Sequence, residues 1–305
     1  MSFHEILIAV MAAFAVAGAI DRIFGNRWGL GKEFEAGIFA MGSLALAMVG
    51  IVCLAPVLAS LLKPVIVPVF AFLGADPAMF AGTILACDMG GGALAVELAE
   101  KYPFIYAAVG WHPENLKGIP ADYLQQLAEW AQHPKVVAIG EIGLDYYWKE
   151  NEPKEVQKRI FLEQLDLAKQ FDLPVIIHDR DAHGDMLELF QKEVHGVQAV
   201  FHCFSGSLEM AKELAKRGYY FGFGGTSTYK NAQKVREVMQ YIPKELLLFE
   251  TDSPYLTPVP FRGKRNNPGY TEYTARNAAE VLGMDFEELA AIATANTKRL
   301  FKKIK

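Results

Sequence analysis

The chain has 305 residues, which suit one large domain or two ordinary ones, and a net charge of −5 at pH 7. Residues 1–100 contain four Lys or Arg and eight Asp or Glu, whereas residues 101–305 contain 26 Lys or Arg and 27 Asp or Glu. Neither part has the basic excess by which charge alone would indicate nucleic-acid binding. The three cysteines are widely spaced and odd in number, which argues against a disulfide framework and fits a reducing compartment.

The first hundred residues have the composition of a membrane protein. Residues 36–62 form a stretch of 27 residues without a charge, and a bilayer-spanning helix needs about 20 apolar residues. A buried helix of a soluble core is the alternative, but such helices are usually shorter and have one polar face. Residues 6–20 fit a tilted span or an interfacial helix, and no charged region or clear cleavage site marks a signal peptide. We therefore expect an all-α, membrane-like segment over residues 1–100.

Two shorter apolar pieces, 64–75 and 77–87, follow and are interrupted by Asp76 and Asp88. In transporters, helices interrupted in this way form cation sites together with such carboxylates. The alternative is that the two aspartates lie at ordinary loop ends. The phrases "GIFAMGSLALAMVGIVCLAPVLA" and "LGADPAMFAGTILACDMGG" resemble the ethanolamine permease-like family, EutH, over about residues 1–100. Members of that family are much longer, so the resemblance implies a membrane-bound remnant of a permease and not a complete transport pathway.

From residue 101 onward, short β-rich runs alternate with helical patterns. A helix is predicted over 155–171, and another over 208–217 with Ser207 as its cap and Gly218 as its stop; Asp285 with Glu288 caps a third that runs to residue 293. Buried strands that alternate with amphipathic helices predict parallel βα units, as in a (β/α) barrel. The runs are 104–109, 136–139, 175–177, 199–201, 219–223 and 246–249.

Six strands are fewer than the eight of a closed (β/α) barrel. An open, doubly wound sheet is the alternative, but the glycine fingerprint of nucleotide-binding sheets is absent, because "GFGG" at 222–225 has the wrong spacing. The predicted fold class is α/β preceded by the helical segment, and the residues alone leave the barrel and the open sheet as alternatives. An incomplete TIM (β/α) barrel is what the family resemblance given below implies.

Four polar residues come just after predicted strands. They are Glu141 in "GEIGLD", His178 in "VIIHDRDAHGD", His202 in "FHCFSG" and Asp252 in "FETDSP". Each one alone fits a structural role, but two imidazoles and two carboxylates at one barrel mouth form a ligand set for Zn²⁺ or Mn²⁺. Such an ion lowers the pKa of bound water and polarises a phosphoryl or carbonyl oxygen.

Other residues are candidates for substrate contacts. His112 in "VGWHP" ends the first predicted strand, although His-Pro also fits a turn. Ser205 precedes a predicted helix, where backbone N–H groups favour a phosphate oxygen, but the Ser207 cap competes for that turn. The loop "TPVPFRGKRNNP" contains three basic residues, Arg262, Lys264 and Arg265, which are candidates for binding a phosphodiester backbone. The alternative is a basic loop that is simply solvated.

The phrases "AAVGWHP", "VVAIGEIGLDYYW", "PVIIHDRDAH", "HCFSGS", "LLLFETDSPYLTPVPFRGKRN" and "ANTKRLF" together resemble the TatD family of metal-dependent deoxyribonucleases, in family order across about residues 101–305. The resemblance implies a cytoplasmic barrel that hydrolyses phosphodiester bonds of DNA or a related substrate with divalent metal (Mn²⁺, Mg²⁺ or Zn²⁺). It implies that Glu141 bridges two metals, that His178 and His202 bind one, and that Asp252 binds the other or orients the nucleophilic water. His112 would contact the scissile phosphate.

One element of the family pattern is missing. The family begins with a strand that ends in His-x-His, and no His-x-His occurs in this chain. We therefore expect residues 101–305 to be a hydrolase domain without its first two strands, joined to residues 1–100 at the shared phrase "ELAEKYP". At most one metal site would be intact and nuclease activity severely reduced or lost. The alternative is a chimeric or membrane-anchored fragment without intact activity. The full chain would be membrane-associated, and no protein partner is indicated.

Overall fold

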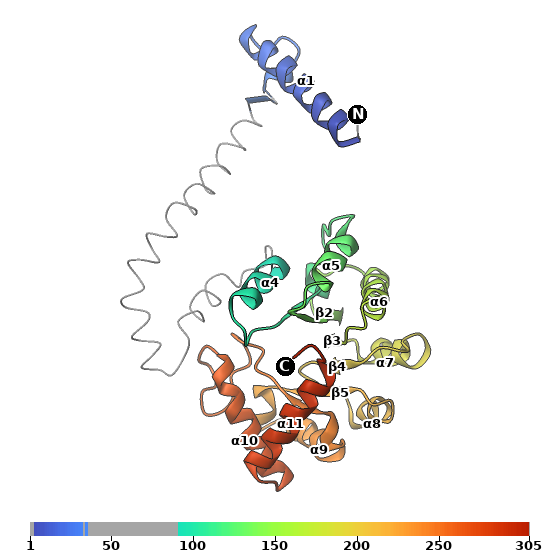
Figure 1. Cartoon of the computed structure of the whole chain (residues 1–305), viewed down its shortest axis with the longest axis vertical. Helices are drawn as coiled ribbons and strands as arrows, with labels where there is room; N and C mark the ends of the chain where they lie inside the picture. The colour runs from blue at the N-terminus through green and yellow to red at the C-terminus, as the bar shows by residue number, and fades with distance from the viewer. Residues whose placement is uncertain (1–2, 33, 36–90, 305) are drawn as a thin grey trace, which may run out of the picture. The chain divides into compact units, whose positions relative to one another are not determined.

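The structure is a computed structural model of the chain, and it describes residues 3–32, 34–35 and 91–304 (Figure 1). The chain divides into two compact units, Met1–Gly82 and Thr83–Lys305. The predicted span 36–62 and the apolar pieces 64–75 and 77–87 lie outside the described residues.

The first unit contains helix α1 (Phe3–Ile23), which includes the predicted apolar segment 6–20. Its end is fixed by Asp21, whose carboxylate accepts hydrogen bonds from the backbone N–H groups of Trp28 (3.0 Å) and Gly31 (2.8 Å). None of the helices in the described ranges is both long and apolar enough to cross a bilayer. The tilted span considered for residues 6–20 is therefore not confirmed.

The second unit contains a parallel sheet of six strands, which confirms the predicted number. The strands pair in chain order, each with the next. They are β1 (Ala107–Val109), β2 (Val136–Asp145), β3 (Val175–Arg180), β4 (Ala199–Phe201), β5 (Tyr220–Phe223) and β6 (Leu247–Phe249).

Strands β2 and β3 run several residues beyond the predicted bounds. Their last paired positions join Gly143 to His178 and Asp145 to Arg180. The sequence prediction ended both strands where the apolar run gives way to Gly and charged residues. The backbone pairing continues because polar side chains at the carboxyl ends of barrel strands point into the open mouth.

Helices surround the strands (Figure 1). Two predicted caps are present. The Ser207 hydroxyl accepts the backbone N–H of Met210 at 3.2 Å at the start of one helix. The Asp285 carboxylate accepts the backbone N–H groups of Glu287 and Glu288 at the start of another. The helices are α4 (Gly91–Lys101), α5 (Tyr123–Ala131), α6 (Lys154–Gln170), α7 (His183–Lys192), α8 (Leu208–Lys216), α9 (Gln233–Tyr241), α10 (Thr271–Leu282) and α11 (Phe286–Leu300), with short 3-10 turns η1 (Pro113–Asn115), η2 (Gly225–Thr228), η3 (Lys244–Leu246) and η4 (Pro268–Tyr270).

Helix α11 does not stop at residue 293, as the sequence prediction had it, but continues to Leu300. The buried Asn296 accounts for the extra turns, because its side-chain amide donates to the carbonyls of Lys244 (2.7 Å) and Leu247 (2.9 Å). The helix is thereby fixed to the start of β6. Beyond it, the Lys303 ammonium donates to the carbonyls of Ala131, His133 and Val136, at 3.4, 3.4 and 2.9 Å.

Strands β1 and β6 are the two ends of the sheet, and within residues 91–304 no strand pairs with the outer edge of either. Helix α4 packs against β1 and α5. Its Ala99 is completely buried, and its Glu100 pairs with His133 at 2.9 Å. A hydrophobic core contains the strands and the inner faces of the helices around them.

Gly143 allows β2 and β3 to approach closely at the level of His178. Its φ is +150°, and a Cβ atom there would stand 1.9 Å from the carbonyl oxygen of His178. No side chain fits in that space, so only glycine permits this pairing.

We expect the Gly143→Ala substitution to lower the free energy of unfolding by more than about 2 kcal/mol, because the methyl group overlaps the β3 backbone. The matched control is Gly184→Ala in the first turn of α7, where a Cβ meets nothing within 4 Å. That change should be neutral or stabilising by up to about 1 kcal/mol. Urea unfolding midpoints of both variants measure the difference, and equal midpoints would contradict the close approach.

Candidate metal centre

Five of the predicted site residues lie together at the carboxyl ends of the strands. Glu141 is on β2, His178 is on β3, His202 directly follows β4, Asp252 follows β6, and His112 follows β1. The Oε1 atom of Glu141 lies 2.9 Å from Nδ1 of His178, 3.6 Å from Nε2 of His202 and 4.0 Å from Nε2 of His112. Nε2 of His202 also lies 3.6 Å from Oδ1 of Asp252.

A buried carboxylate orients His178 from behind. Oδ2 of Asp145 lies 2.9 Å from Nε2 of His178, and the Asp145 side chain is completely buried. Its other oxygen accepts the backbone N–H of Tyr147 at 3.0 Å, which holds the carboxylate in place. In the metal-free protein, Nε2 donates to Asp145 and Nδ1 donates to Glu141. Because Asp145 holds the Nε2 proton, Nδ1 is the nitrogen that would offer its lone pair to a metal ion beside Glu141 after losing its own proton.

His202 has the same kind of support. Its Nδ1 is hydrogen-bonded to Oε2 of Glu250, while Oε1 of Glu250 accepts the backbone N–H of Cys203 at 2.8 Å. Gly222 makes room for this carboxylate, because a Cβ there would lie 3.0 Å from Oε2 of Glu250. Nε2 of His202 is left facing Glu141 and Asp252, which is the usual carboxylate–histidine arrangement behind a metal ion.

His112 differs from the other two histidines. Its Nδ1 accepts the backbone N–H of Glu114 at 3.2 Å, so the proton of the neutral ring is on Nε2. Its ring meets that of His178 edge-on, with centroids 4.3 Å apart. Burial and the positive charge of His178 lower the pKa of His112 to about 4. His112 is therefore neutral at pH 7 and presents an N–H donor to the site.

Glu141, His178 and His202 are held in their charged forms. Burial opposes ionisation of Glu141, but the hydrogen bond from His178 and the charge of His202 outweigh it and lower the Glu141 pKa to about 2. Burial likewise opposes protonation of His178, yet its hydrogen bonds to Asp145 and Glu141 raise its pKa to about 9. His202 also has a raised pKa, because contacts with Asp252 and Glu250 outweigh its burial.

The donor set fits a divalent metal ion. Ligand atoms about 2.0–2.2 Å from a tetrahedral or octahedral ion lie roughly 3.0–3.6 Å from one another. The distances from Glu141 Oε1 to His178 (2.9 Å) and to His202 (3.6 Å) each match that spacing, although the ligand atoms of these three residues do not all lie within 4.8 Å of one another. Atoms of His112 lie within 4.8 Å of Glu141 and His178, but the proton on Nε2 makes His112 a donor and not a ligand. Ligand atoms of a second group, Glu114, Asp145 and His178, also lie within 4.8 Å of one another.

Sequence reasoning missed Asp145, Glu250 and Glu114. Asp145 and Glu250 stand in the very phrases "GEIGLD" and "FETDSP" that were selected for Glu141 and Asp252. Their partners on other strands are 33 and 48 residues away in sequence. No local spacing therefore indicates these contacts, although the presence of a second acid in each phrase was a usable signal.

Within residues 91–304, no hydrogen bond, ion pair or ring contact joins Ser205, Arg262 or Lys264 to this cluster. Among the described residues, the ion pairs of Glu141 involve only the three histidines. Ser205 is exposed in the turn before α8. In the loop before η4, the Arg262 guanidinium lies 4.2 Å from the Tyr229 ring centroid and the Lys264 ammonium lies 5.8 Å from that of Phe261, with Arg265 next in the chain.

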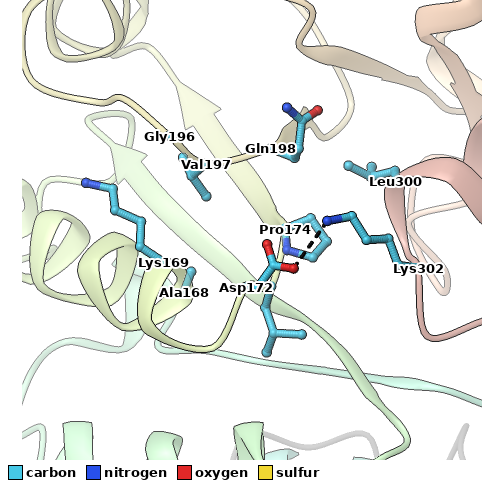
Figure 2. A pocket seen from close by; sticks show the side chains of 10 residues that line it. Ala168, Lys169, Asp172, Pro174, Gly196, Val197, Gln198, Leu300 and Lys302 are labelled. Atoms are coloured by element: carbon cyan, nitrogen blue, oxygen red, sulfur yellow. Dashed lines mark hydrogen bonds and ion pairs between the residues drawn. The ribbon is translucent and has the colours of Figure 1, made fainter.

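A small cavity of about 50 Å³ lies at the other ends of the strands. Figure 2 shows the side chains that line it. Pro174, directly before β3, and Gln198, directly before β4, line it together with Asp172 and Lys302, which are 3.2 Å apart. Since catalytic residues of (β/α) barrels stand at the carboxyl ends of the strands, this cavity is not part of the metal centre.

Comparison with known families gives two matches. Residues 78–302 match the model of the TatD related DNase family. The chain belongs to this family. Residues 3–110 match the model of the ethanolamine utilisation protein EutH, which overlaps the first match. Both resemblances found in the sequence are thereby confirmed.

Relatives of this TatD family chain are named as hydrolases. The metal-dependent hydrolase YabD of Bacillus subtilis is 50% identical over 209 residues, which cover 68% of this chain and 82% of YabD. The 3′-5′ ssDNA/RNA exonuclease TatD of Escherichia fergusonii is 37% identical over 214 residues, which cover 68% of this chain and 82% of the exonuclease.

Solved structures confirm the barrel architecture. The crystal structure of YJJV, a TatD homolog from Escherichia coli K12, is 38% identical and superposes with a TM-score of 0.64 over 69% of this chain and 82% of YJJV. A TatD family hydrolase from Entamoeba histolytica, at 24% identity, has a TM-score of 0.63 over 70% and 81%. At 24% identity, the similarity to the Entamoeba histolytica protein supports a shared fold and nothing more.

Without metal, the contact between Glu141 and His178 should make stability depend on pH. The raised pKa of His178 contributes stability that is fully present below its ordinary 6.5 and is lost as the pH rises through about 9. The lowered pKa of Glu141 contributes stability that is present above its ordinary 4.5 and is lost as the pH falls through about 2.

The measurement is the melting temperature in EDTA as a function of pH, for the natural chain and for His178→Asn. The difference between them should be largest between pH 4.5 and 6.5 and should shrink toward pH 9. A difference that stays constant from pH 5 to 10 would contradict the assigned charge states.

Proposed function

We propose that this chain is a metal-dependent hydrolase of phosphodiester bonds whose remaining metal site consists of Glu141, His178 and His202. The observation that carries the proposal is the position of the two imidazole nitrogens beside one oxygen of Glu141, each imidazole with a carboxylate behind it. A divalent ion held there would lower the pKa of a bound water and polarise a phosphoryl oxygen. The name of the Escherichia fergusonii relative supports DNA or RNA as the substrate.

The residues around that site have distinct roles in the proposal. Glu141 stays ionised over the working pH range, because its pKa is about 2. Asp145 and Glu250 hold the two histidines in the orientation that ligation needs. The neutral His112 donates its Nε2 proton in a hydrogen bond to a phosphoryl oxygen, and Asp252, 3.6 Å from His202, accepts a proton from the attacking water or holds that water in position.

The second metal site of the proposed centre is incomplete. In the family, the His-x-His at the end of the first strand supplies two ligands, and this chain has no His-x-His. Glu141 and Asp252 alone leave a second ion with two protein ligands, fewer than the three or more that catalytic zinc sites use. We therefore propose that hydrolysis by this chain is severely reduced. Ser205, Arg262, Lys264 and Arg265 remain candidate phosphate contacts.

The test is the amount of Mn²⁺ or Zn²⁺ bound per chain at equilibrium, with hydrolysis of single-stranded DNA measured in parallel. We expect a single ion per chain and none in Glu141→Gln, whereas the control Asp166→Asn, an exposed acid on α6, keeps the ion. Turnover should be at least about 100-fold slower than that of the Escherichia fergusonii exonuclease, since one missing ion removes several kcal/mol of charge stabilisation. Two tightly bound ions, or rapid turnover that depends on Glu141, would refute the impairment.

A second candidate function rests on the match of residues 3–110 to the EutH model. In this alternative, the chain is a chimeric or membrane-anchored fragment related to ethanolamine transport, and the barrel unit has no intact activity. The uncharged sequence of residues 36–62 supports the anchor.

If residues 1–82 anchor the chain, the purified full chain should float with phosphatidylcholine vesicles in a density gradient. A chain that begins at residue 83, the start of the barrel unit, should stay in the dense fraction, because it lacks the uncharged segment. Equal distribution of the two chains would rule the anchor out.

A further inference from the structure

Two large aromatic side chains are exposed at the mouth of the barrel, directly after β2. Tyr147 is 49% exposed and Trp148 is 41% exposed, and their rings meet edge-on with centroids 4.8 Å apart. The guanidinium carbon of Arg180 lies 3.9 Å from the ring centroid of Tyr147 and 5.5 Å from that of Trp148. These three residues are called the Tyr147–Trp148–Arg180 cluster below.

The backbone attaches this cluster to the metal centre. Arg180 is the register partner of Asp145 at the last position of β3, two residues beyond His178. Oδ1 of Asp145 accepts the backbone N–H of Tyr147 at 3.0 Å and that of Trp148 at 3.4 Å. The carboxylate that orients His178 therefore also fixes the loop that presents the rings.

The chemistry of the cluster matches a nucleotide. An exposed aromatic ring stacks on any nucleobase, at about 1–3 kcal/mol per base. A guanidinium stacked on an aromatic ring has fewer orientations open to it and presents a planar set of N–H donors, which suits a phosphate group. A base inside a duplex is already stacked on its neighbours, so this surface suits a single strand.

We propose that the Tyr147–Trp148–Arg180 cluster holds the nucleotide adjacent to the scissile phosphodiester of a single-stranded nucleic acid, with its base against the rings and its phosphate on Arg180. This inference rests on the proposed function and adds the residues that hold the nucleotide beside the reacting bond.

The experiment is fluorescence anisotropy of a labelled, phosphorothioate-linked oligothymidylate with the full chain, in Mn²⁺ and in EDTA and over a range of salt concentrations. Trp148→Ala should weaken binding about 5- to 150-fold without changing the salt dependence, and Trp148→Phe should retain most of the affinity. Arg180→Ala should weaken binding and reduce the salt slope by about 0.7, because one phosphate contact is lost.

Two variants on the outer helices are matched controls. Tyr241 on α9 is 51% exposed with the Lys212 ammonium 5.3 Å from its ring, and Arg276 on α10 lies 3.9 Å from the Phe286 ring. Tyr241→Ala and Arg276→Ala repeat the same chemistry away from the mouth and should bind like the natural chain. Melting temperatures verify that each variant is folded.

Three results would overturn the cluster's role: unchanged binding by Trp148→Ala and Arg180→Ala, equal affinity for the matching duplex, or no binding by the natural chain. An abasic oligomer gives an independent check, because it should bind the natural chain and Trp148→Ala equally. Failure of the proposed hydrolase would appear elsewhere, as metal binding that does not depend on Glu141.

Discussion

The arrangement of the barrel mouth depends on one oxygen atom. Oε1 of Glu141 faces Nδ1 of His178 and Nε2 of His202, and the opposite nitrogen of each ring is hydrogen-bonded to an acid, Asp145 or Glu250. A cluster so rich in carboxylates is stable only if protons or a cation balance the charge. The same contacts that hold the protons in the metal-free protein therefore define the proposed position of a metal ion.

Much of the fold follows from the sequence because buried parallel strands are continuous apolar runs. The short strands β4 and β6 are examples, since each consists of apolar residues and was predicted at or within one residue of its observed bounds. The carboxyl end of β2 was not predictable in this way. There, the pairing depends on a glycine at the crossing with His178, and the reason for that glycine is visible only when both strands are in place.

Residue types and their positions after strands predicted which side chains would meet at the site. They did not predict how the imidazole rings are turned, which distinguishes the donor His112 from the two proposed ligands. That distinction comes from a backbone N–H two residues further along the chain, at Glu114, and from carboxylates on neighbouring strands. The proposed metal site and the proposed nucleotide contact share Asp145, so in these proposals binding of the ion and ordering of the substrate would depend on a common group.

The contact of Lys303 with Val136 spans 167 residues of the chain. The carbonyl oxygens at the start of β2 therefore have no partner from the chain's end until nearly the whole protein has been synthesised. Contacts of such large sequence separation cost loop-closure entropy and slow folding. The start of β2 therefore gains this partner late in synthesis, and loss of Lys303 would remove a donor from the Val136 carbonyl while β1 and β3 still pair with the strand.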